Sequence, residues 1–206
     1  MMTSKKFNKH EFTVLGGYSY QYTVNEGFSA YNFDFPTDAF SYNNLDAGNA
    51  LSDGKAGMGS YKNDDKLIGF FGRVNYNFDS KYDLLFSMRR EGSSKFGANY
   101  QWGNFPAVSA GWSLHKESFL KDVSFVNNLK LRGGYGVTGV IPNDSYMSKT
   151  LYKYQGYFYN DGKWVKGLVP DSNPNPDLRW EKTAEINIGL DFGFVNNRIS
   201  GSFDVY

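Results

Sequence analysis

Residues 68–78 read IGFFGRVNYNF and alternate apolar with polar side chains over most of their length. One side of this stretch carries Ile68, Phe70, Gly72, Val74, Tyr76 and Phe78, and the other carries Gly69, Phe71, Arg73, Asn75 and Asn77. A period of two is typical of a β-strand whose two faces meet different surroundings. The stretch therefore predicts a two-faced sheet, and the function depends on what lies against each face.

The composition favours β-structure and excludes several classes of function. Aromatic residues make up 18% of the 206 residues and 23 residues are glycine, which favours a sheet with aromatic belts. The net charge of +1 gives no support for binding nucleic acid or an anionic surface. The absence of cysteine excludes disulfide bonds and thiolate metal sites.

Neither a transmembrane helix nor a signal peptide is expected from the sequence. No apolar run approaches the ~20 residues that a membrane-spanning helix needs. The first residues, MMTSKKFNKHEF, lack the apolar segment of a signal peptide. A mean hydropathy of −0.54 does not exclude a membrane barrel, because half of each barrel strand is polar.

The same alternation recurs along the chain and predicts seven strands. They cover residues 11–24, 67–78, 82–91, 102–115, 129–137, 181–195 and 198–206. Strands of globular proteins average about 5–6 residues, whereas about 9–11 tilted residues span a bilayer. The predicted lengths therefore favour strands that cross a membrane.

The predicted connections alternate between short and long. Asp79-Ser80 and Asn196-Asn197 are expected to be tight turns, residues 116–128 a medium connection, and residues 25–66, 92–101 and 138–180 long loops. If the tight turns share one end of a barrel, every long loop falls at the other end. This sorting is typical of outer-membrane barrels, which have short periplasmic turns and long extracellular loops.

The first long loop is expected to contain a short helix. Thr37 or Asp38 would cap this helix, which would run through Leu45. In the third long loop, residues 171–176 (DSNPNP) are not expected to form a ladder strand, because proline has no backbone donor.

Aromatic residues gather beside the predicted tight turns. Tyr76, Phe78 and Tyr82 surround one turn, and Phe192 and Phe194 precede the other. An aromatic girdle at a membrane interface has this arrangement. Aromatic pairs across the hairpins of a soluble sheet are the alternative, but strand length, loop sorting and aromatic position together favour the membrane.

Six motifs, in order, resemble those of the SusC/RagA family of TonB-linked outer-membrane transporters. They are FGRVNY at 71–76, GSSKFG at 92–97, WGNFPAVSAGW at 102–112, LKLRGGYGVTG at 129–139, NPDLRWEK at 175–182 and IGLDFGFVNNRISG at 188–201. The resemblance is dense over residues 66–206 and looser over residues 11–48. Gly133-Gly134 departs locally from the family pattern.

The resemblance implies an all-β fold, an antiparallel up-and-down transmembrane β-barrel. Barrels of this family have about 22 strands, so seven strands form only part of one. We therefore expect residues 1–206 to be a fragment from the C-terminal half of the barrel domain, without a plug domain, a TonB box or the closing strand.

The resemblance also implies import of oligosaccharides or peptides across the outer membrane of a Gram-negative bacterium. The implied partners are a SusD-like surface lipoprotein, the TonB complex acting through the plug domain, and outer-membrane lipid. We expect no nucleic-acid partner and no cofactor. The alternative is a soluble all-β carbohydrate-binding or adhesin module, which would bury its apolar row against a second sheet.

The polar faces of the predicted strands form a row that the barrel interpretation turns toward the lumen. Its members are Arg73, Asn75, Arg89, Lys130, Arg132, Glu185, Asn187 and Asp191, with Asn77 and Asp204 beside them. Ladders of opposite charges that stabilise the sheet are the favoured interpretation. A role in lining the solute path or in contacting the plug domain is the alternative.

The third long loop is rich in aromatic residues, namely Tyr152, Tyr154, Tyr157, Phe158, Tyr159 and Trp164. Aromatic rings stack on sugars and on peptide side chains, and loops commonly carry function. Tyr157, Tyr159 and Trp164 are therefore candidates for contact with the solute or the partner. Packing of the loop on itself is the alternative.

No arrangement of residues predicts an enzyme or a metal site. His10 and His115 are far apart in the sequence and lie in no metal-ligand cluster. Glu181 and Glu185 share a strand face, but a solvated lumen surface explains them better than acid–base catalysis. Asp161-Gly162 predicts a β-turn, because the spaced ligands of a calcium loop are missing.

Overall fold

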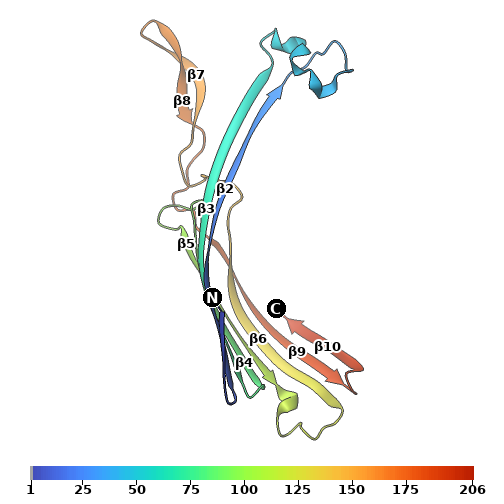
Figure 1. The fold of residues 1–206 in the computed structure, drawn as a ribbon. Helices are drawn as coiled ribbons and strands as arrows, with labels where there is room; N and C mark the ends of the chain where they lie inside the picture. The colour runs from blue at the N-terminus through green and yellow to red at the C-terminus, as the bar shows by residue number, and fades with distance from the viewer. Residues whose placement is uncertain (1) are drawn as a thin grey trace. The chain divides into compact units, whose positions relative to one another are not determined.

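The computed structural model describes residues 2–206, which form an all-β structure (Figure 1). An eight-stranded sheet has the order β1-β2-β3-β4-β5-β6-β9-β10, and β7 and β8 form a separate two-stranded sheet. The strands are β1 Met2–Phe7, β2 His10–Tyr31, β3 Gly57–Phe78, β4 Tyr82–Ser93, β5 Trp102–Ser113, β6 Val126–Val140, β7 Tyr152–Asn160, β8 Lys163–Pro170, β9 Glu181–Phe194 and β10 Ile199–Val205. The predicted antiparallel all-β class is confirmed.

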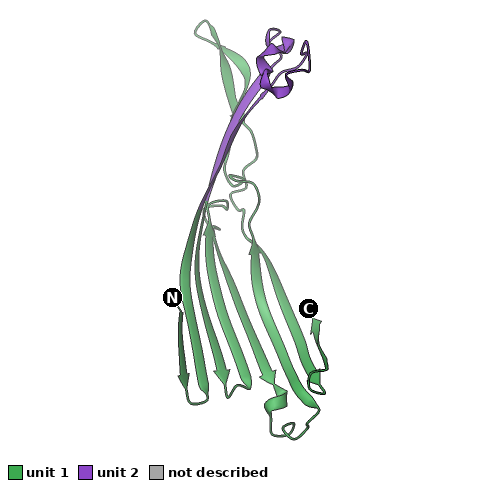
Figure 2. Cartoon of the chain, turned by 45° about the vertical axis from the view of Figure 1, so that its right-hand side comes forward, with its two compact units in different colours: residues 1–21, 66–206 green, residues 22–65 purple. Residues whose placement is uncertain are grey.

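The described chain divides into two compact units (Figure 2). The smaller unit is Tyr22–Asp65, and the larger unit holds the rest. In the larger unit the strands follow one another across the sheet, with the two chain ends at opposite edges. Edges β1 and β10 each have one neighbouring strand, so the sheet is not closed within this chain.

The smaller unit contains three 3-10 helices in place of the predicted short helix. They are Ser41–Asn43, Leu45–Ala47 and Asn49–Leu51. The Asn32 side-chain amide donates to the carbonyls of Leu45 and Gly48, both at 2.9 Å, and so holds this loop in a folded form. The Thr37 hydroxyl accepts a bond from the Ala39 amide at 3.2 Å. The prediction of one capped helix through Leu45 was therefore wrong, because the backbone turns repeatedly instead of continuing.

All seven predicted strands are present, and three further strands were missed. Strands β2 and β3 have 22 residues each, so the loop predicted over residues 25–66 is shorter than expected. β1 is charged and shows little alternation. It forms by pairing with β2, in a register that runs from Phe7↔His10 to Met2↔Leu15. A strand of this kind depends on its partner and not on its own pattern.

The β7–β8 hairpin occupies what was predicted as a structureless part of the third long loop. Its turn is Asp161-Gly162, with φ of 47° and 80°, which confirms the predicted β-turn. Asp-Gly between alternating aromatic residues is a strong hairpin signal. The sequence therefore contains a signal for the whole hairpin and not for an isolated turn alone.

The two predicted tight turns have positive φ as expected, but they are longer than two residues: the connections are residues 79–81 and 195–198. Asp79 and Ser80 have φ of 52° and 55°, and Val195, Asn196 and Asn197 have φ between 53° and 58°. In the larger unit, the antiparallel order puts the connections after β1, β3, β5 and β9 at one end of the sheet and those after β4 and β6 at the other. The predicted sorting of short and long connections therefore holds in this unit.

Strand register confirms that the sheet has two chemically different faces. One cross-strand row contains Phe78, Tyr82, Trp112, Leu131, Leu190 and Phe203, and the neighbouring row contains Asn77, Asp83, Gly111, Arg132, Gly189 and Asp204. Residues that pair directly lie on the same face. We call the first the apolar face and the second the polar face.

The apolar face is not covered by the described residues. Leu84, Phe86 and Ile188 are 49%, 54% and 59% exposed in the middle of the sheet. Exposed apolar patches of this size mark contact with a membrane or another protein. Among residues 2–206, no helix is long and apolar enough to pass through a membrane.

Aromatic rings gather at the short-turn end of the apolar face, as predicted. Tyr82 stacks between Phe78 and Trp112, with ring centroids 6.2 and 6.3 Å apart. Phe192 and Phe194 stack at 5.6 Å before the second turn. The rings therefore form a band across several strands and not one isolated pair.

Candidate functional site

The eight residues predicted to face the lumen all lie on the polar face. Arg73 and Asn75 are on β3, Arg89 is on β4, Lys130 and Arg132 are on β6, and Glu185, Asn187 and Asp191 are on β9. The register places them in neighbouring rows across the sheet. The row of Arg73 continues through Ser87, Ala107 and Gly136 to Glu185. The row of Asn75 continues through Leu85, Ser109 and Gly134 to Asn187. The period-two alternation of the sequence was sufficient to predict which residues share this face.

An ion pair on the polar face bridges two strands that are not neighbours. Lys130 Nζ on β6 lies 2.6 Å from Asp83 Oδ2 on β4, so the lysine passes over β5. The strand beneath it carries Gly111, where an added Cβ would come within 2.8 Å of Lys130 Cε. Strands two apart are separated by about 9–10 Å. Glycine therefore leaves the space through which the lysine reaches its partner.

A second bridge has the same construction. Arg132 on β6 binds Asp191 on β9 through Nη2 and Oδ1 at 3.0 Å, and binds Asp204 on β10 through Nη1 and Oδ1 at 2.7 Å. Gly189 lies beneath the guanidinium, where a Cβ would come within 2.6 Å of Arg132 Cζ. The planar guanidinium can satisfy two carboxylates at once, which a lysine cannot do with the same geometry.

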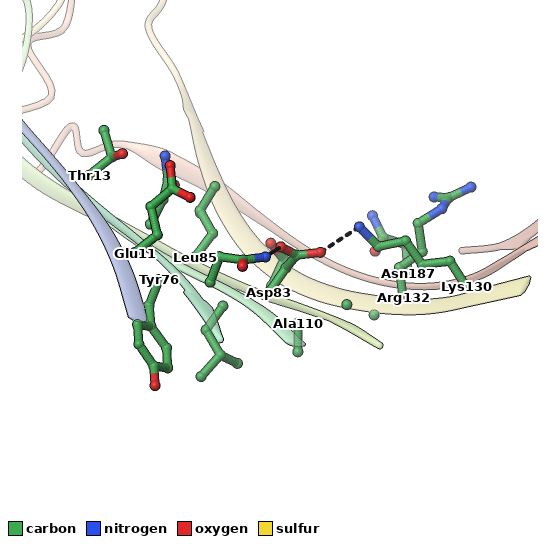
Figure 3. A pocket seen from close by; sticks show the side chains of 15 residues that line it. Glu11, Thr13, Tyr76, Asp83, Leu85, Ala110, Lys130, Arg132 and Asn187 are labelled. Atoms are coloured by element: carbon green, nitrogen blue, oxygen red, sulfur yellow. Dashed lines mark hydrogen bonds and ion pairs between the residues drawn. The ribbon is translucent and has the colours of Figure 1, made fainter. Parts of the chain in front are cut away.

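These bridges line a hollow of about 670 Å³ on the polar face. Figure 3 shows Asp83 joined to Lys130, while Tyr76 points away from Glu11, toward the other side of the sheet. The side-chain oxygen Asn75 Oδ1 is buried without a hydrogen-bond partner among residues 2–206. Buried acceptors are normally satisfied by a donor. Asn75 lines this hollow, but its Oδ1 atom is covered by neighbouring atoms and is an unsatisfied acceptor among the described residues.

Only some of the predicted residues are brought into direct contact. Arg132 and Asp191 pair with each other, but Lys130 pairs with Asp83, and Arg89 pairs with Glu91 through Nε at 2.7 Å. Asp83 and Glu91 were missed, although both occupy odd positions of β4 and share the face of Arg89. The alternation of β4 extends to both residues, so the sequence contains the signal that places them on this face.

The long-connection end of the larger unit has its own small hydrophobic core. Phe96, Phe105 and Trp180 are buried together, with ring centroids 4.7 Å apart for Phe96–Trp180 and 5.0 Å apart for Phe105–Trp180. The Trp180 indole donates to the Gln101 carbonyl at 2.9 Å. This cluster joins the connection after β4 to the start of β9, and sequence alternation did not reveal it.

Further contacts fix the same two connections to each other. Lys95 Nζ donates to the Asn143 carbonyl at 2.8 Å, and the Gly97 amide donates to the Leu178 carbonyl at 2.9 Å. A Cβ on Gly97 would lie 1.7 Å from the Pro176 carbonyl oxygen, so only glycine fits. The base of the β7–β8 excursion is thus attached firmly to the connection after β4.

The three predicted contact residues share one face of the β7–β8 hairpin. Tyr159 lies opposite Trp164, and Tyr157 lies opposite Lys166. Tyr157, Tyr159 and Trp164 are 64%, 63% and 68% exposed, and the rings of Tyr159 and Trp164 meet edge to face at 5.4 Å. Tyr159 and Trp164 thus contact each other within the hairpin, while all three side chains keep most of their surface exposed.

The described residues contain no group of three or more side chains suited to holding a metal ion. The Tyr76 hydroxyl lies 2.8 Å from His10 Nδ1, and the Leu129 amide donates to His115 Nδ1 at 3.2 Å. Each histidine thus has a structural partner. Glu181 and Glu185 occupy the same face of β9, as predicted, and both are exposed.

Sequence and structure comparisons identify related proteins. Residues 3–206 match the family described as TonB dependent receptor-like, beta-barrel. The chain is 38% identical over 204 residues to TonB-dependent receptor P3 of Formosa agariphila, covering 98% of this chain and 20% of that protein. It is 40% identical over 152 residues to TonB-dependent receptor SusC of Bacteroides thetaiotaomicron, covering 71% of this chain and 15% of that protein.

Solved structures show the same fold. The RagAB peptide importer in its 'closed-closed' state matches with a TM-score of 0.81 at 28% identity, covering 98% of this chain and 22% of that one. The 'open-open' state matches with a TM-score of 0.75 at 29% identity, covering 96% and 21%. The chain thus spans about a fifth of the length of TonB-dependent receptor P3, and its match to SusC covers about a seventh of that protein.

Proposed function

Because the chain belongs to the TonB-dependent receptor-like β-barrel family, we propose that residues 1–206 form part of the barrel domain of an outer-membrane nutrient transporter. The family consists of transporters and receptors, and its SusC and RagA members are outer-membrane barrels. The observation that carries the proposal is the two-faced sheet, whose apolar face is exposed across its centre. Lipid would cover this face, while the polar face would line the lumen.

The proposal also explains why the sheet is open. Strands β1 and β10 leave two edges whose backbone groups need partners. A bilayer offers no water to satisfy them, so a spanning sheet must close. In the complete transporter, further strands of the same barrel would pair with both edges.

The transported solute would be an oligosaccharide or a peptide. The solved neighbours are described as a peptide transporter and importer, and SusC is a relative at 40% identity. By analogy, a SusD-like surface lipoprotein would bind the solute together with this barrel, and the TonB complex would act through a plug domain. Tyr157, Tyr159 and Trp164 are exposed on a hairpin after β6 and would contact the solute or the lipoprotein.

The eight polar-face residues would take two kinds of role in the lumen. Lys130, Arg132 and Asp191 form bridges between strands and would stabilise the barrel. Asn75 has a buried oxygen without a donor among the described residues, and its side chain would have to turn toward the lumen for this oxygen to bind a group there. A plug segment, a water molecule or the solute could supply this donor.

Single cysteines test the orientation, because these 206 residues contain none. In the complete transporter on intact cells, Gly162→Cys at the hairpin tip should react with a membrane-impermeant maleimide. Asn196→Cys at the tight turn should react only after the outer membrane is opened, and Ile188→Cys should be shielded by lipid. Labelling of Asn196→Cys but not Gly162→Cys on intact cells would reverse the proposed orientation.

Uptake measurements test the activity itself. A strain that lacks the complete transporter should lose uptake of at least one class of oligosaccharide or peptide, and the wild-type gene should restore it. Stable, monodisperse behaviour of the complete protein in buffer without detergent would instead support the soluble binding module.

A further inference from the structure

The β7–β8 hairpin concentrates positive charge. It holds Lys153, Lys163 and Lys166 against Asp161, a net charge of +2 (three lysines minus one aspartate), whereas the whole chain has a net charge of +1. Lys153 pairs at 2.8 Å with Asp171, just beyond β8. Within residues 2–206, Lys163 and Lys166 have no ion pair. Lys163 and Lys166 are thus the hairpin's two ammonium groups without an ion pair, and with Asp171 included the segment has a net charge of +1 (three lysines minus two aspartates).

Lys166 lies among three exposed rings, whereas Lys163 shares its face of the hairpin with one, Phe158, which is 53% exposed. The register places Lys166 opposite Tyr157 and Trp164 opposite Tyr159, so these four residues form one face of the hairpin tip. Asn160 and Lys163 lie opposite each other on the other face. The ring-bearing face contains no carboxylate. We call this surface, Tyr157, Tyr159, Trp164 and Lys166, the ring face.

We propose that the ring face binds an acidic oligosaccharide, one whose sugar rings carry carboxylate or sulfate groups. The sugar rings would stack on the aromatic faces, and Lys166 Nζ would donate to the acidic group. The proposal rests on the proposed transport function and narrows its solute class. Stacking supplies apolar contact to a flat ring, and a charge-assisted hydrogen bond selects the anionic member of the class.

The form of the ring face favours a sugar over an acidic peptide. Tyr157 and Tyr159 are two residues apart on one strand, which sets their side chains about 7 Å apart in a row. All three aromatic side chains are more than 60% exposed, so they present a platform and not an enclosed pocket. A peptide would instead pair along the outer edge of β7 or β8, neither of which has a further strand beside it among residues 2–206, and would leave the ring face free.

The base of the hairpin is held in place by backbone hydrogen bonds, which favours binding. The Asp171 amide donates to the Leu151 carbonyl at 2.8 Å, and the Asn175 amide donates to the Met147 carbonyl at 2.9 Å. These bonds close the base of the excursion beside the Phe96–Trp180 cluster. A surface that is already ordered loses less conformational entropy when it binds a ligand.

The test uses the complete transporter in detergent and measures binding by calorimetry. The probes are tetramers of α-1,4-galacturonate and β-1,4-mannuronate, a sulfated galactan tetramer, and methyl-esterified galacturonate as the uncharged match. At least one acidic tetramer should bind. If the tetramer that binds is galacturonate, its methyl ester should bind about tenfold more weakly. If it is one of the other two acidic tetramers, its affinity should fall as the salt concentration rises, because the contact is electrostatic.

Two substitutions make a matched pair. Lys166→Met should weaken binding of the acidic tetramer about tenfold, whereas Lys163→Met, the same charge change on the opposite face, should change it less than twofold. Trp164→Ala should weaken binding of acidic and uncharged tetramers alike. As a control, each variant should still pull down as much of the co-purifying surface lipoprotein as the wild type does. A change in tetramer binding then reflects a lost contact with the sugar.

Three results would overturn the inference while leaving the transporter proposal intact. One is uptake of neutral oligosaccharides or of peptides with no binding of any acidic tetramer. Another is an equal effect of Lys166→Met and Lys163→Met. The third is loss of the lipoprotein in Trp164→Ala with sugar binding unchanged, which would make the ring face a protein contact. Failure of the transporter proposal would differ, since no solute of any class would then be taken up.

Discussion

The Tyr82 hydroxyl donates a hydrogen bond of 2.6 Å to Glu117 Oε1, in the connection between β5 and β6. The Trp112 indole donates to the same oxygen at 3.0 Å, and Lys81 Nζ lies 3.1 Å from Oε2. One carboxylate thus holds two stacked rings of the aromatic band. These hydrogen bonds stabilise the charged form of Glu117 and lower its pKa to about 2, and the bond from Tyr82 contributes most.

Acid should loosen this end of the sheet. Because the folded-state pKa of Glu117 lies below its unfolded value of 4.5, its contribution to stability is complete above about pH 4.5 and is lost as the pH falls toward 2. In the complete protein, Glu117→Gln should unfold at a lower temperature at pH 6 and show a smaller pH dependence between pH 5 and 2. Tryptophan fluorescence during thermal unfolding would measure this change.

The control for this prediction is Asp122→Asn, a carboxylate in the same connection that makes no comparable set of bonds. It should reproduce the wild-type pH dependence. If Glu117→Gln and Asp122→Asn behave alike, the bonds to Tyr82 and Trp112 do not stabilise the folded protein.

Glycines on the two faces should respond differently to substitution. On the polar face, Gly111→Val would place its Cβ within 2.8 Å of Lys130 Cε and displace the bridge to Asp83. Because Lys130 is flexible and the pair is partly exposed, its displacement should cost about 0.5–1 kcal/mol. On the apolar face, a Cβ at Gly133 would meet only the Asn187 carbonyl oxygen at 3.6 Å.

Gly133→Val should therefore change stability by less than about 1 kcal/mol, and the higher strand preference of valine makes a small gain the expected direction. Urea unfolding of both variants, refolded into the same detergent, measures the difference. A larger loss for Gly133→Val than for Gly111→Val would contradict the role assigned to the Lys130 bridge.

Arg132 should be coupled energetically to Asp204. Arg132→Met leaves Asp191 and Asp204 without their cation and should cost about 1 kcal/mol, a modest value because all three side chains are partly exposed. Adding Asp204→Asn removes one of the two carboxylates left unpaired, so the double variant should lose less than the sum of the single losses. A double-mutant cycle by urea unfolding measures the coupling, and strict additivity would show that the bridge is inert.

The Trp180 cluster should keep the two connections that it joins in an ordered conformation. Trp180→Ala removes ring contacts with Phe96 and Phe105 and should destabilise this region by about 3–5 kcal/mol. Trp180→Phe keeps a ring but loses the bond to Gln101, at a cost of about 1 kcal/mol or somewhat more. Hydrogen exchange of residues 94–101 should rise strongly in the first variant and slightly in the second.

Exchange in the middle of β9 serves as the internal reference for that experiment. It should remain unchanged, because the cluster lies at one end of the sheet. A uniform rise across β9 would mean that Trp180 stabilises the whole sheet and not its loop end alone.

Predictions from the sequence succeeded where a residue's position depends on its immediate neighbours. The faces of Arg73, Asn75 and Glu185 followed from a period of two, which any strand imposes. They failed where a segment depends on a distant partner. β1 has little pattern of its own and forms by pairing with β2, and the helix expected before Leu45 is replaced by turns that Asn32 holds from outside the segment.

The sequence by itself determined the strands, their two faces and the sorted connections, because alternation and turn residues act over a few neighbouring positions. Only the tertiary structure decided which side chains meet, such as Lys130 with Asp83 across Gly111, or Trp180 with Phe96. Those contacts depend on strand register and on the space above each glycine, and neither is encoded by local periodicity. The exposure of the apolar face likewise depends on how the strands assemble, since none of residues 2–206 covers it.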